Sequence, residues 1–293
     1  VPAGVTSFTV GYATTQDNIH EADETTTLTI GASTGTGTIT NDDAVPTLSV
    51  GNNTQVEGTN LVHTVTLSNA SSTAQSYAIS LTGNTATAGT DFDDVLANAV
   101  FSGGVTYNAG TGQITVPAGV TSFTVGYATT QDNIHEADET TTLTIGASTG
   151  TGTITNDDAV PTLSVGNNTQ VEGTNLVHTV TLSNPSSTAQ SYAISLTGNT
   201  ATAGTDFDNN LANAVFSNGV TYDAGTGQIT VPAGVTSFTV GYATVQDNIH
   251  EADETTTLTI GGSTGTGTIT NDDAVPTLSV GNNTQVEGTN LVH

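Results

Sequence analysis

The chain lacks lysine, arginine, cysteine, methionine and tryptophan, and only 5% of its residues are aromatic. Because a protein needs lysine or arginine to release counterions from phosphates, a nucleic-acid partner is excluded. The absence of cysteine excludes disulfides, zinc–thiolate sites and cysteine nucleophiles. A polybasic lipid anchor is also excluded, and no apolar run is long enough to span a bilayer, so we expect no direct membrane insertion of this segment.

What is present is acid and a short apolar period. The 293 residues include 27 acids, which gives a formal net charge of −27. High charge favours disorder, yet only 9% of residues are charged. Apolar residues alternate with polar ones in short runs such as 61–67 and 114–116, bounded by Gly, Asn and Asp. This two-residue period predicts half-buried strands rather than a solvated coil.

An internal repeat sets the domain organisation. The segment that starts at Val1 returns at Val116 and Val231, which gives a period of 116 − 1 = 115 residues. Residues 1–115 and 116–230 differ only at the pairs Ala70/Pro185, Asp94/Asn209, Val95/Asn210, Gly103/Asn218 and Asn108/Asp223. A period of this length is too long for a solenoid unit and typical of a whole β-sandwich. We interpret the chain as a window in a longer repeat protein.

Each period predicts seven or eight strands, separated by turns rich in Gly and Asn. In the first complete copy we expect them near residues 46–50, 61–68, 76–82, 98–107, 113–116, 121–130, 140–146 and 151–155. Pro46, Pro161 and Pro276 each follow an Asn-Asp-Asp-Ala-Val stretch and mark domain starts. The expected domains are complete repeats at 46–160 and 161–275, the end of a repeat at 1–45 and the beginning of one at 276–293.

The acids of each repeat fall in four clusters, all in predicted turns. In the 46–160 repeat the clusters lie near residues 57, 91–94, 132–139 and 157–158. Turns of an antiparallel sandwich meet at its ends, so the clusters are expected to converge on one pole. Two carboxylates about 5 Å apart repel by roughly 3 kcal/mol at an effective dielectric constant near 20. Several such pairs would exceed an ordinary folding stability, so the pattern predicts bound Ca²⁺, which accepts six to eight oxygen ligands. Solvated acidic loops are the alternative.

Four motifs carry a family resemblance: 132–140 (Asp-Asn-Ile-His-Glu-Ala-Asp-Glu-Thr), 87–92 (Thr-Ala-Gly-Thr-Asp-Phe), 116–119 (Val-Pro-Ala-Gly) and 152–158 (Gly-Thr-Ile-Thr-Asn-Asp-Asp). In this order and spacing the chain resembles tandem Calx-β domains, known from sodium/calcium exchangers, integrin β4 and large bacterial adhesin-like surface proteins. The resemblance implies an all-β chain of tandem Ig-like antiparallel β-sandwiches arranged as an elongated rod. It also implies Ca²⁺ at the end of each sandwich that adjoins the next domain.

The resemblance assigns ligands residue by residue. Gln131 and Asn156 stand where the calcium-sensing members carry more acid, which implies one to three ions per junction. Asp94, which the next repeat replaces by Asn209, and Asp138 are expected to be bystanders. The implied calcium ligands, with Ile134 and Ile249 offering a backbone carbonyl, are Glu57, Asp91, Asp132, Ile134, Glu136, Glu139, Asp157 and Asp158 in one repeat, Glu172, Asp206, Asp247, Ile249, Glu251, Glu254, Asp272 and Asp273 in the next, and Asp17, Glu21, Glu24, Asp42 and Asp43 in the N-terminal part-repeat.

The combined interpretation is a structural repeat region of an extracellular or cell-surface fibre, stalk or adhesin, bacterial by the resemblance. Calcium would stiffen the junctions, and the partners would be neighbouring repeats of the same chain, with lateral self-association into fibres as a further option. Two alternatives stay open: a regulatory calcium sensor of a membrane transporter, and a module that binds glycans or surfaces directly. We expect no enzymatic activity, because no nucleophile motif occurs and tandem near-copies favour a length-setting role.

Overall fold

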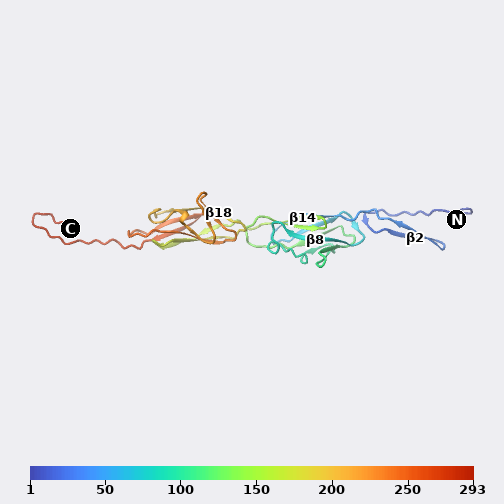
Figure 1. Cartoon of the computed structure of the whole chain (residues 1–293), viewed down its shortest axis with the longest axis horizontal. Helices are drawn as coiled ribbons and strands as arrows, with labels where there is room; N and C mark the ends of the chain where they lie inside the picture. Colours follow the sequence, from blue (N-terminus) through green and yellow to red (C-terminus); the bar gives the residue numbers. More distant parts are fainter. The chain divides into compact units, whose positions relative to one another are not determined.

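The computed structural model describes residues 1–293 and is built almost entirely of strands; its one helical element is the 3₁₀ turn Leu211–Asn213. The chain divides into two compact units, Val1–Asp132 with Ala137–Asp157, and Asn133–Glu136 with Asp158–His293. Strands β8 and β14 in Figure 1 belong to the sandwich of the first unit and β18 to that of the second. No helix is both long and apolar enough to cross a bilayer.

The first sandwich packs a four-stranded sheet on a six-stranded one. The smaller sheet has the order β4 (Leu48–Val50), β6 (Leu61–Leu67), β12 (Ser122–Tyr127) and β9 (Val100–Phe101). The larger has the order β10 (Thr106–Asn108), β11 (Gln113–Val116), β8 (Gln75–Gly83), β13 (Glu139–Ile145), β14 (Ser148–Thr155) and β5 (Asn53–Val56). All pairs are antiparallel except β5 with β14, which is parallel.

The second sandwich repeats this topology. Its smaller sheet has the order β15 (Leu163–Val165), β17 (Leu176–Leu182), β22 (Ser237–Tyr242) and β19 (Val215–Phe216). Its larger sheet has the order β16 (Asn168–Val171), β24 (Ser263–Thr270), β23 (Glu254–Ile260), β18 (Gln190–Gly198), β21 (Gln228–Val231) and β20 (Thr221–Asp223). Outside the sandwiches, β2 (Glu24–Ile30) and β3 (Ser33–Ile39) form a hairpin, and β1 (Ile19–His20) pairs with β7 (Ala70–Ser71).

The cores follow the alternation of the sequence. Strand β6 buries every second side chain and exposes those between, so Leu61 and Val65 face the core while Val62 faces solvent. His63 has no exposed surface; its Nδ1 hydrogen-bonds to the carbonyl of Gly51 (2.8 Å) and its Nε2 to Tyr127 Oη (3.1 Å). Burial lowers the pKa of His63. The histidine is therefore a structural core residue, as its strand position indicates.

The prediction of tandem all-β sandwiches is confirmed, with two local errors. The expected strands do not include Asn53–Val56, because this segment is largely polar. In the structure it forms β5, an edge strand paired with β14. The expected strand 98–107 is two strands, β9 and β10, because Gly103 and Gly104 both adopt positive φ and break it. The domain boundaries at 46, 161 and 276 and the arrangement as a rod stay predictions.

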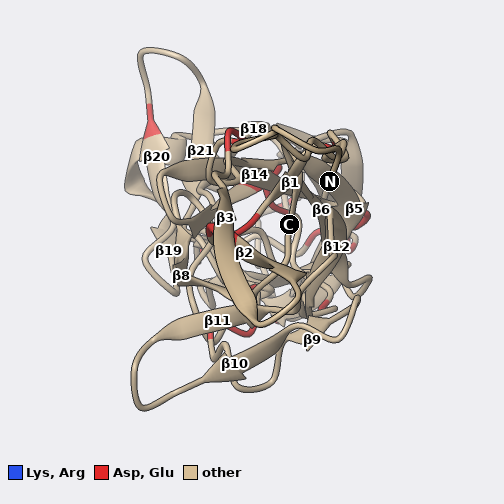
Figure 2. Cartoon of the chain, turned by 90° about the vertical axis from the view of Figure 1, so that its right-hand side faces the viewer, with Lys and Arg blue, Asp and Glu red and all other residues tan.

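Charge is kept away from the strands. Figure 2 shows the acidic residues in red, mostly in loops, and no part of the cartoon is blue because the chain has no lysine or arginine. The acids that do belong to strands lie at strand ends: Glu24, Glu139 and Glu254 begin β2, β13 and β23, and Asp223 ends β20. On β13 and β14 the outward positions pair threonine with threonine, as at Thr142 and Thr151. The sheet faces are consequently neutral and rich in hydroxyl groups.

Candidate metal centre

In the second repeat, six acids from distant parts of the sequence gather in two groups of three. One group is Glu172, Asp272 and Asp273; the other is Asp206, Glu251 and Glu254. Within each group, one carboxylate oxygen of each residue lies within 4.8 Å of the others. These are all residues that the sequence selected as candidate ligands. No cationic side chain separates them, because the chain contains no lysine or arginine.

The parallel pairing of β16 with β24 builds the first group. Glu172 follows β16 and its N–H donates to Thr270 O (3.1 Å), so it lies beside Asp272, which follows β24. The Asp272 N–H donates to Glu172 Oε1 (3.2 Å), and Gln246 Nε2 donates to Asp272 Oδ1 (3.0 Å). Gly173 has a φ of 76°, and a β-carbon there would lie 2.7 Å from Gln246 Oε1, so glycine is required for this close approach.

The second group is held by a tight turn and the start of a strand. Asp206 is buried, its Oδ2 accepts the N–H of Thr202 (2.5 Å), and its backbone carbonyl accepts the N–H of Val245 (2.9 Å). Burial, followed by a hydrogen bond to Asp206 and the charges of Asp206, Glu251 and Glu172, raises the pKa of Glu254 to about 7. Near neutral pH this carboxyl therefore retains a proton in part, which reduces the repulsion.

The two groups lie at the same pole. Glu172, Asp206, Asp247, Glu251 and Glu254 line one hollow of ≈ 10 Å³, about the space that a single water-sized occupant needs. Burial raises the pKa of Glu251, and the nearby charges of Asp206, Asp247, Glu172 and Asp273 raise it further. The expected convergence of the four acidic clusters thus occurs within this repeat.

The acidic loop places the remaining candidates. Asp247 Oδ1 accepts the N–H of Ile249 (2.7 Å), which curls the loop around the hollow. Asp253 belongs to neither group, and its Oδ1 accepts the N–H of Asn271 (3.3 Å). The Ile249 side chain is 59% exposed, and the role of its carbonyl as a ligand stays a prediction.

The donor set fits a hard divalent cation. Asp273 Oδ2 is buried and has no hydrogen-bond donor, which is costly for a carboxylate unless a cation or a proton compensates it. The side chains at this pole offer oxygen and no sulfur, which favours Ca²⁺ over soft transition metals. Calcium would be held by the carboxylates of the two groups together with Asp247.

Two neutral residues hydrogen-bond to the candidate ligands, a role that the sequence analysis did not assign to them. Gln246 donates to a candidate ligand, Asp272, and Asn271 accepts the N–H of Glu251 (3.0 Å) while its Nδ2 donates to Asp273 O (2.9 Å). Gln131 and Asn156, their counterparts, were considered only as positions where related domains carry more acid. Their position directly beside acids was the available signal that they orient the carboxylates.

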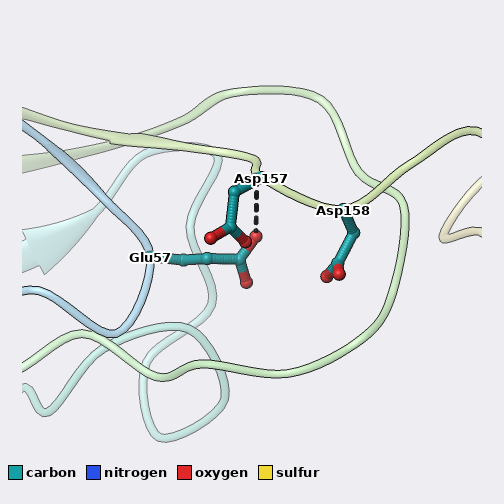
Figure 3. Close-up of side chains that lie close together, drawn as sticks. All are labelled: Glu57, Asp157 and Asp158. Atoms are coloured by element: carbon teal, nitrogen blue, oxygen red, sulfur yellow. Dashed lines mark hydrogen bonds between the residues drawn. The ribbon is translucent and has the colours of Figure 1, made fainter.

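The first unit contains matching contacts among its own acids: Glu57 lies beside Asp157, and Asp91 lies beside Glu139. In Figure 3 the Asp157 N–H donates to Glu57 Oε1 (3.2 Å). Asp132, Ile134 and Glu136 lie in the acidic loop, and Asp158 directly follows Asp157 in the sequence. Asp94 takes part in neither contact.

In the N-terminal part-repeat, the acids Asp17, Glu21, Glu24, Asp42 and Asp43 line one hollow. Burial, followed by the charges of Glu24, Asp17 and Asp43, raises the pKa of Glu21. They form no group of three at ligand distance.

Topology and acidic pole together define a class: β-sandwich modules with clustered carboxylates at one end. The model of the Calx-beta domain matches residues 97–164 and 213–279, which include the acidic loop and the final acid pair of each complete repeat. Two segments of the chain, one in each complete repeat, therefore match the Calx-beta domain, a family of calcium-binding modules.

Three solved structures are among those to which the chain is similar over most of its length. The CBD12 of CALX1.2 is 14% identical over 72% of this chain and 78% of that chain, with a TM-score of 0.31. The calcium binding domain CBD12 of CALX1.1 is 15% identical over 73% and 80%, with a TM-score of 0.31. The Yersinia pseudotuberculosis adhesin InvE is 13% identical over 77% and 58%, with a TM-score of 0.30. No curated protein matches the chain.

Proposed function

We propose that this chain is a calcium-stiffened structural repeat region of an extracellular or cell-surface fibre, stalk or adhesin. The observation that carries the proposal is the convergence of Glu172, Asp206, Asp247, Glu251 and Glu254 on one hollow in a chain without lysine or arginine. Calcium bound there would cancel the repulsion and tie the acidic loop to the residues that lead into the next repeat. The partners are then neighbouring repeats of the same chain.

The proposed location outside the cell can be tested through the affinity for calcium. Extracellular calcium modules bind with dissociation constants of roughly 10⁻⁴–10⁻³ M, whereas intracellular sensors reach roughly 10⁻⁷–10⁻⁵ M. Near-identical repeats suit a spacer, whose length scales with copy number, better than a sensor. Lateral association into fibres belongs to the proposal as well, because the neutral faces of the sheets carry no charge that would repel a second chain.

A calcium titration of the whole chain tests the metal and the setting together. Thermal unfolding is measured first in EDTA and then at rising calcium concentrations. Binding at about 100 times the dissociation constant stabilises the folded state by about 2.7 kcal/mol per site, which corresponds to a rise in Tm of roughly 10 °C for a domain of this size. Saturation in the millimolar range supports the proposal, and saturation near micromolar favours the transporter-type sensor. An unchanged Tm refutes the calcium site.

The stiffness of the joint between repeats needs a separate measurement. Because the chain contains no cysteine, introduced cysteines are the only sites that a thiol-reactive label can modify. Ala109 and Ala224 are exposed at equivalent hairpin tips of the two repeats, so Ala109→Cys with Ala224→Cys accepts two spin labels and no others. The proposal predicts that calcium narrows the distance distribution between these labels. The control is the pair Ala97→Cys with Ala109→Cys, both exposed in one repeat, whose distribution should not change.

A further inference from the structure

The Ile-His pair of the acidic loop forms backbone hydrogen bonds with an edge segment of another repeat. In the first unit, Ile19 and His20 form β1 and pair in parallel with Ala70 and Ser71. The N–H of Ser72 donates to His20 O (2.9 Å), and Ser71 Oγ donates to the same carbonyl (3.2 Å). A segment of the 1–45 part-repeat is thus hydrogen-bonded to the sandwich that follows it in the chain.

The second unit contains the same arrangement one period later. The N–H of His135 donates to Pro185 O (3.0 Å), the N–H of Ser187 donates to His135 O (3.0 Å), and Ser186 Oγ donates to His135 O (3.1 Å). Residue 185 contributes only its carbonyl, so the replacement of Ala70 by Pro185 costs no hydrogen bond at this position. One of the few differences between the repeats therefore falls in this segment and preserves its function.

The third copy of the loop provides an internal comparison. Within residues 1–293, neither Ile249 nor His250 forms a bridge. Ile249 is 59% exposed and His250 is exposed, whereas Ile19 and His20 are both half-buried. The pair is therefore less exposed where it forms these backbone hydrogen bonds than where it forms none.

The receiving segment is prepared for this contact. Ser71 is buried (4% exposed), and Gln75 Nε2 donates to its Oγ (2.9 Å), which leaves the hydroxyl proton for His20 O. Beside it, Asn69 Nδ2 donates to the carbonyl of Ala44 in the linker (2.8 Å). The loop and the linker are thus both held by the same few residues of the following sandwich.

We propose that the Ile-His pair of the acidic loop and the Ser-containing segment of the next repeat form a repeat-to-repeat lock. The surface at Ala70–Ser72 is a binding site whose partner is the acidic loop of another copy of this repeat. A joint made by the linker alone would swivel, whereas a second attachment through the loop restricts it. The role of the lock in stiffness rests on the proposed function. Asp132 and Glu136, two candidate calcium ligands, flank Ile134 and His135, so bound calcium would fix the loop that carries the pair.

Hydrogen–deuterium exchange on the whole chain tests the lock, with fragmentation to single residues. The third copy of the loop can be told apart from the other two, because Val245 replaces Thr130. Residues 1–69 and 116–184 are identical, so loop peptides report His20 and His135 together, and both are expected to be protected. Ser187 is read separately, because its peptides contain Pro185. We expect the amides of His135 and Ser187 to exchange at least about tenfold more slowly than the amide of His250, which corresponds to about 1.4 kcal/mol or more of local opening energy. Equal exchange at His135 and His250, with β13 and β23 still protected, would overturn the lock.

Substitution separates the lock from general stability. Ser187→Pro removes the donating N–H and should abolish the slow exchange at His135, whereas Ser187→Ala keeps the N–H and should preserve it. If Ser187→Pro loses protection throughout its sandwich, the comparison of His135 with His250 in the unchanged chain still decides. Measurement in EDTA and in calcium distinguishes the two proposals: a lock that persists while calcium leaves Tm unchanged refutes only the calcium-binding role.

Discussion

The most informative perturbation is a carboxylate-to-amide change at the acidic pole, because its effect should reverse with calcium. Glu254 begins β23 and its pKa is raised from 4.5 to about 7 in the metal-free protein. A folded-state pKa above the unfolded value means that the folded state binds the proton more tightly, so stability falls as pH rises from about 4.5 to 7. At pH 8 the full penalty is present, and Glu254→Gln removes it while keeping the shape and a donor for Asp206.

The magnitude can be worked from the shift. A rise of roughly 2.5 units corresponds to about 3.4 kcal/mol at 1.36 kcal/mol per unit. The side chain is only partly buried, and solvent screening reduces this to about 1–2 kcal/mol. In EDTA at pH 8, the double variant Glu139→Gln with Glu254→Gln should therefore be more stable than the natural chain. In saturating calcium it should be less stable, because loss of a charged ligand that weakens binding about a hundredfold costs about 2.8 kcal/mol per site, which exceeds this gain.

The assay is chemical denaturation in EDTA and in calcium, with a control of equal charge. Asp94→Asn with Asp223→Asn removes two charges that lie outside both acidic groups, and each amide already occurs at the equivalent position of the other repeat, as Asn209 and Asn108. The control should shift stability little, and in the same direction in both buffers. If the Glu139→Gln, Glu254→Gln variant also shifts in one direction only, the carboxylates do not form a calcium site.

Three further outcomes are expected. Magnesium should raise Tm less than calcium at equal concentration, because it requires a smaller octahedral site and retains its waters; equal effects by calorimetry would contradict the assigned ion. Gly150→Ala should destabilise its repeat by about 1–3 kcal/mol, since a β-carbon there would lie 2.6 Å from Val50 Cγ1, whereas Gly35→Ala, in the same sequence context with nothing within 4 Å, should be neutral in urea unfolding. Burial lowers the pKa of His63 and of His178, so these two groups bind fewer protons in the folded than in the unfolded state, and their contribution to stability should fall as pH drops below about 6.5. The contribution is measured as the pH dependence of the stability difference between the natural chain and the variant His63→Gln with His178→Gln; a difference that does not change with pH would contradict it.

The fold could be predicted from the sequence, because the alternation of apolar residues and the positions of the turns agree along the whole repeat. Strands β6 and β13 were predictable to within a residue or two, since their buried positions are apolar at every second residue or nearly so. Strand β5 was not, because an edge strand with polar side chains has no period to read, and it forms only when β14 offers a parallel partner. Its error mattered little for the site, since Glu57 follows β5 in either description.

The sequence predicted which acids belong to the site but not which of them lie together. Clustering of acids in turns located the pole, but which carboxylates pair depends on the parallel contact of β16 with β24 and on the turn that buries Asp206. The lock was not foreseen at all. Ile19 and His20 bond through their backbone, and backbone hydrogen bonds between distant segments leave no mark on side-chain patterns. The assigned calcium ligands stay predictions until an ion is measured.

Near-identity of the repeats has a consequence for how such a chain reaches its native state. All positions that differ between the two complete copies fall outside β6, β8, β13 and β14. Strand β13 pairs with β8 in the same register in which β23 pairs with β18, so β13 fits β18 equally well. Nothing in the side chains rejects the exchange, and a neighbour on the same chain is always close at hand. Correct pairing is then selected by order of synthesis and by short connections, and a fully denatured chain would refold into exchanged sandwiches more readily than a single repeat would.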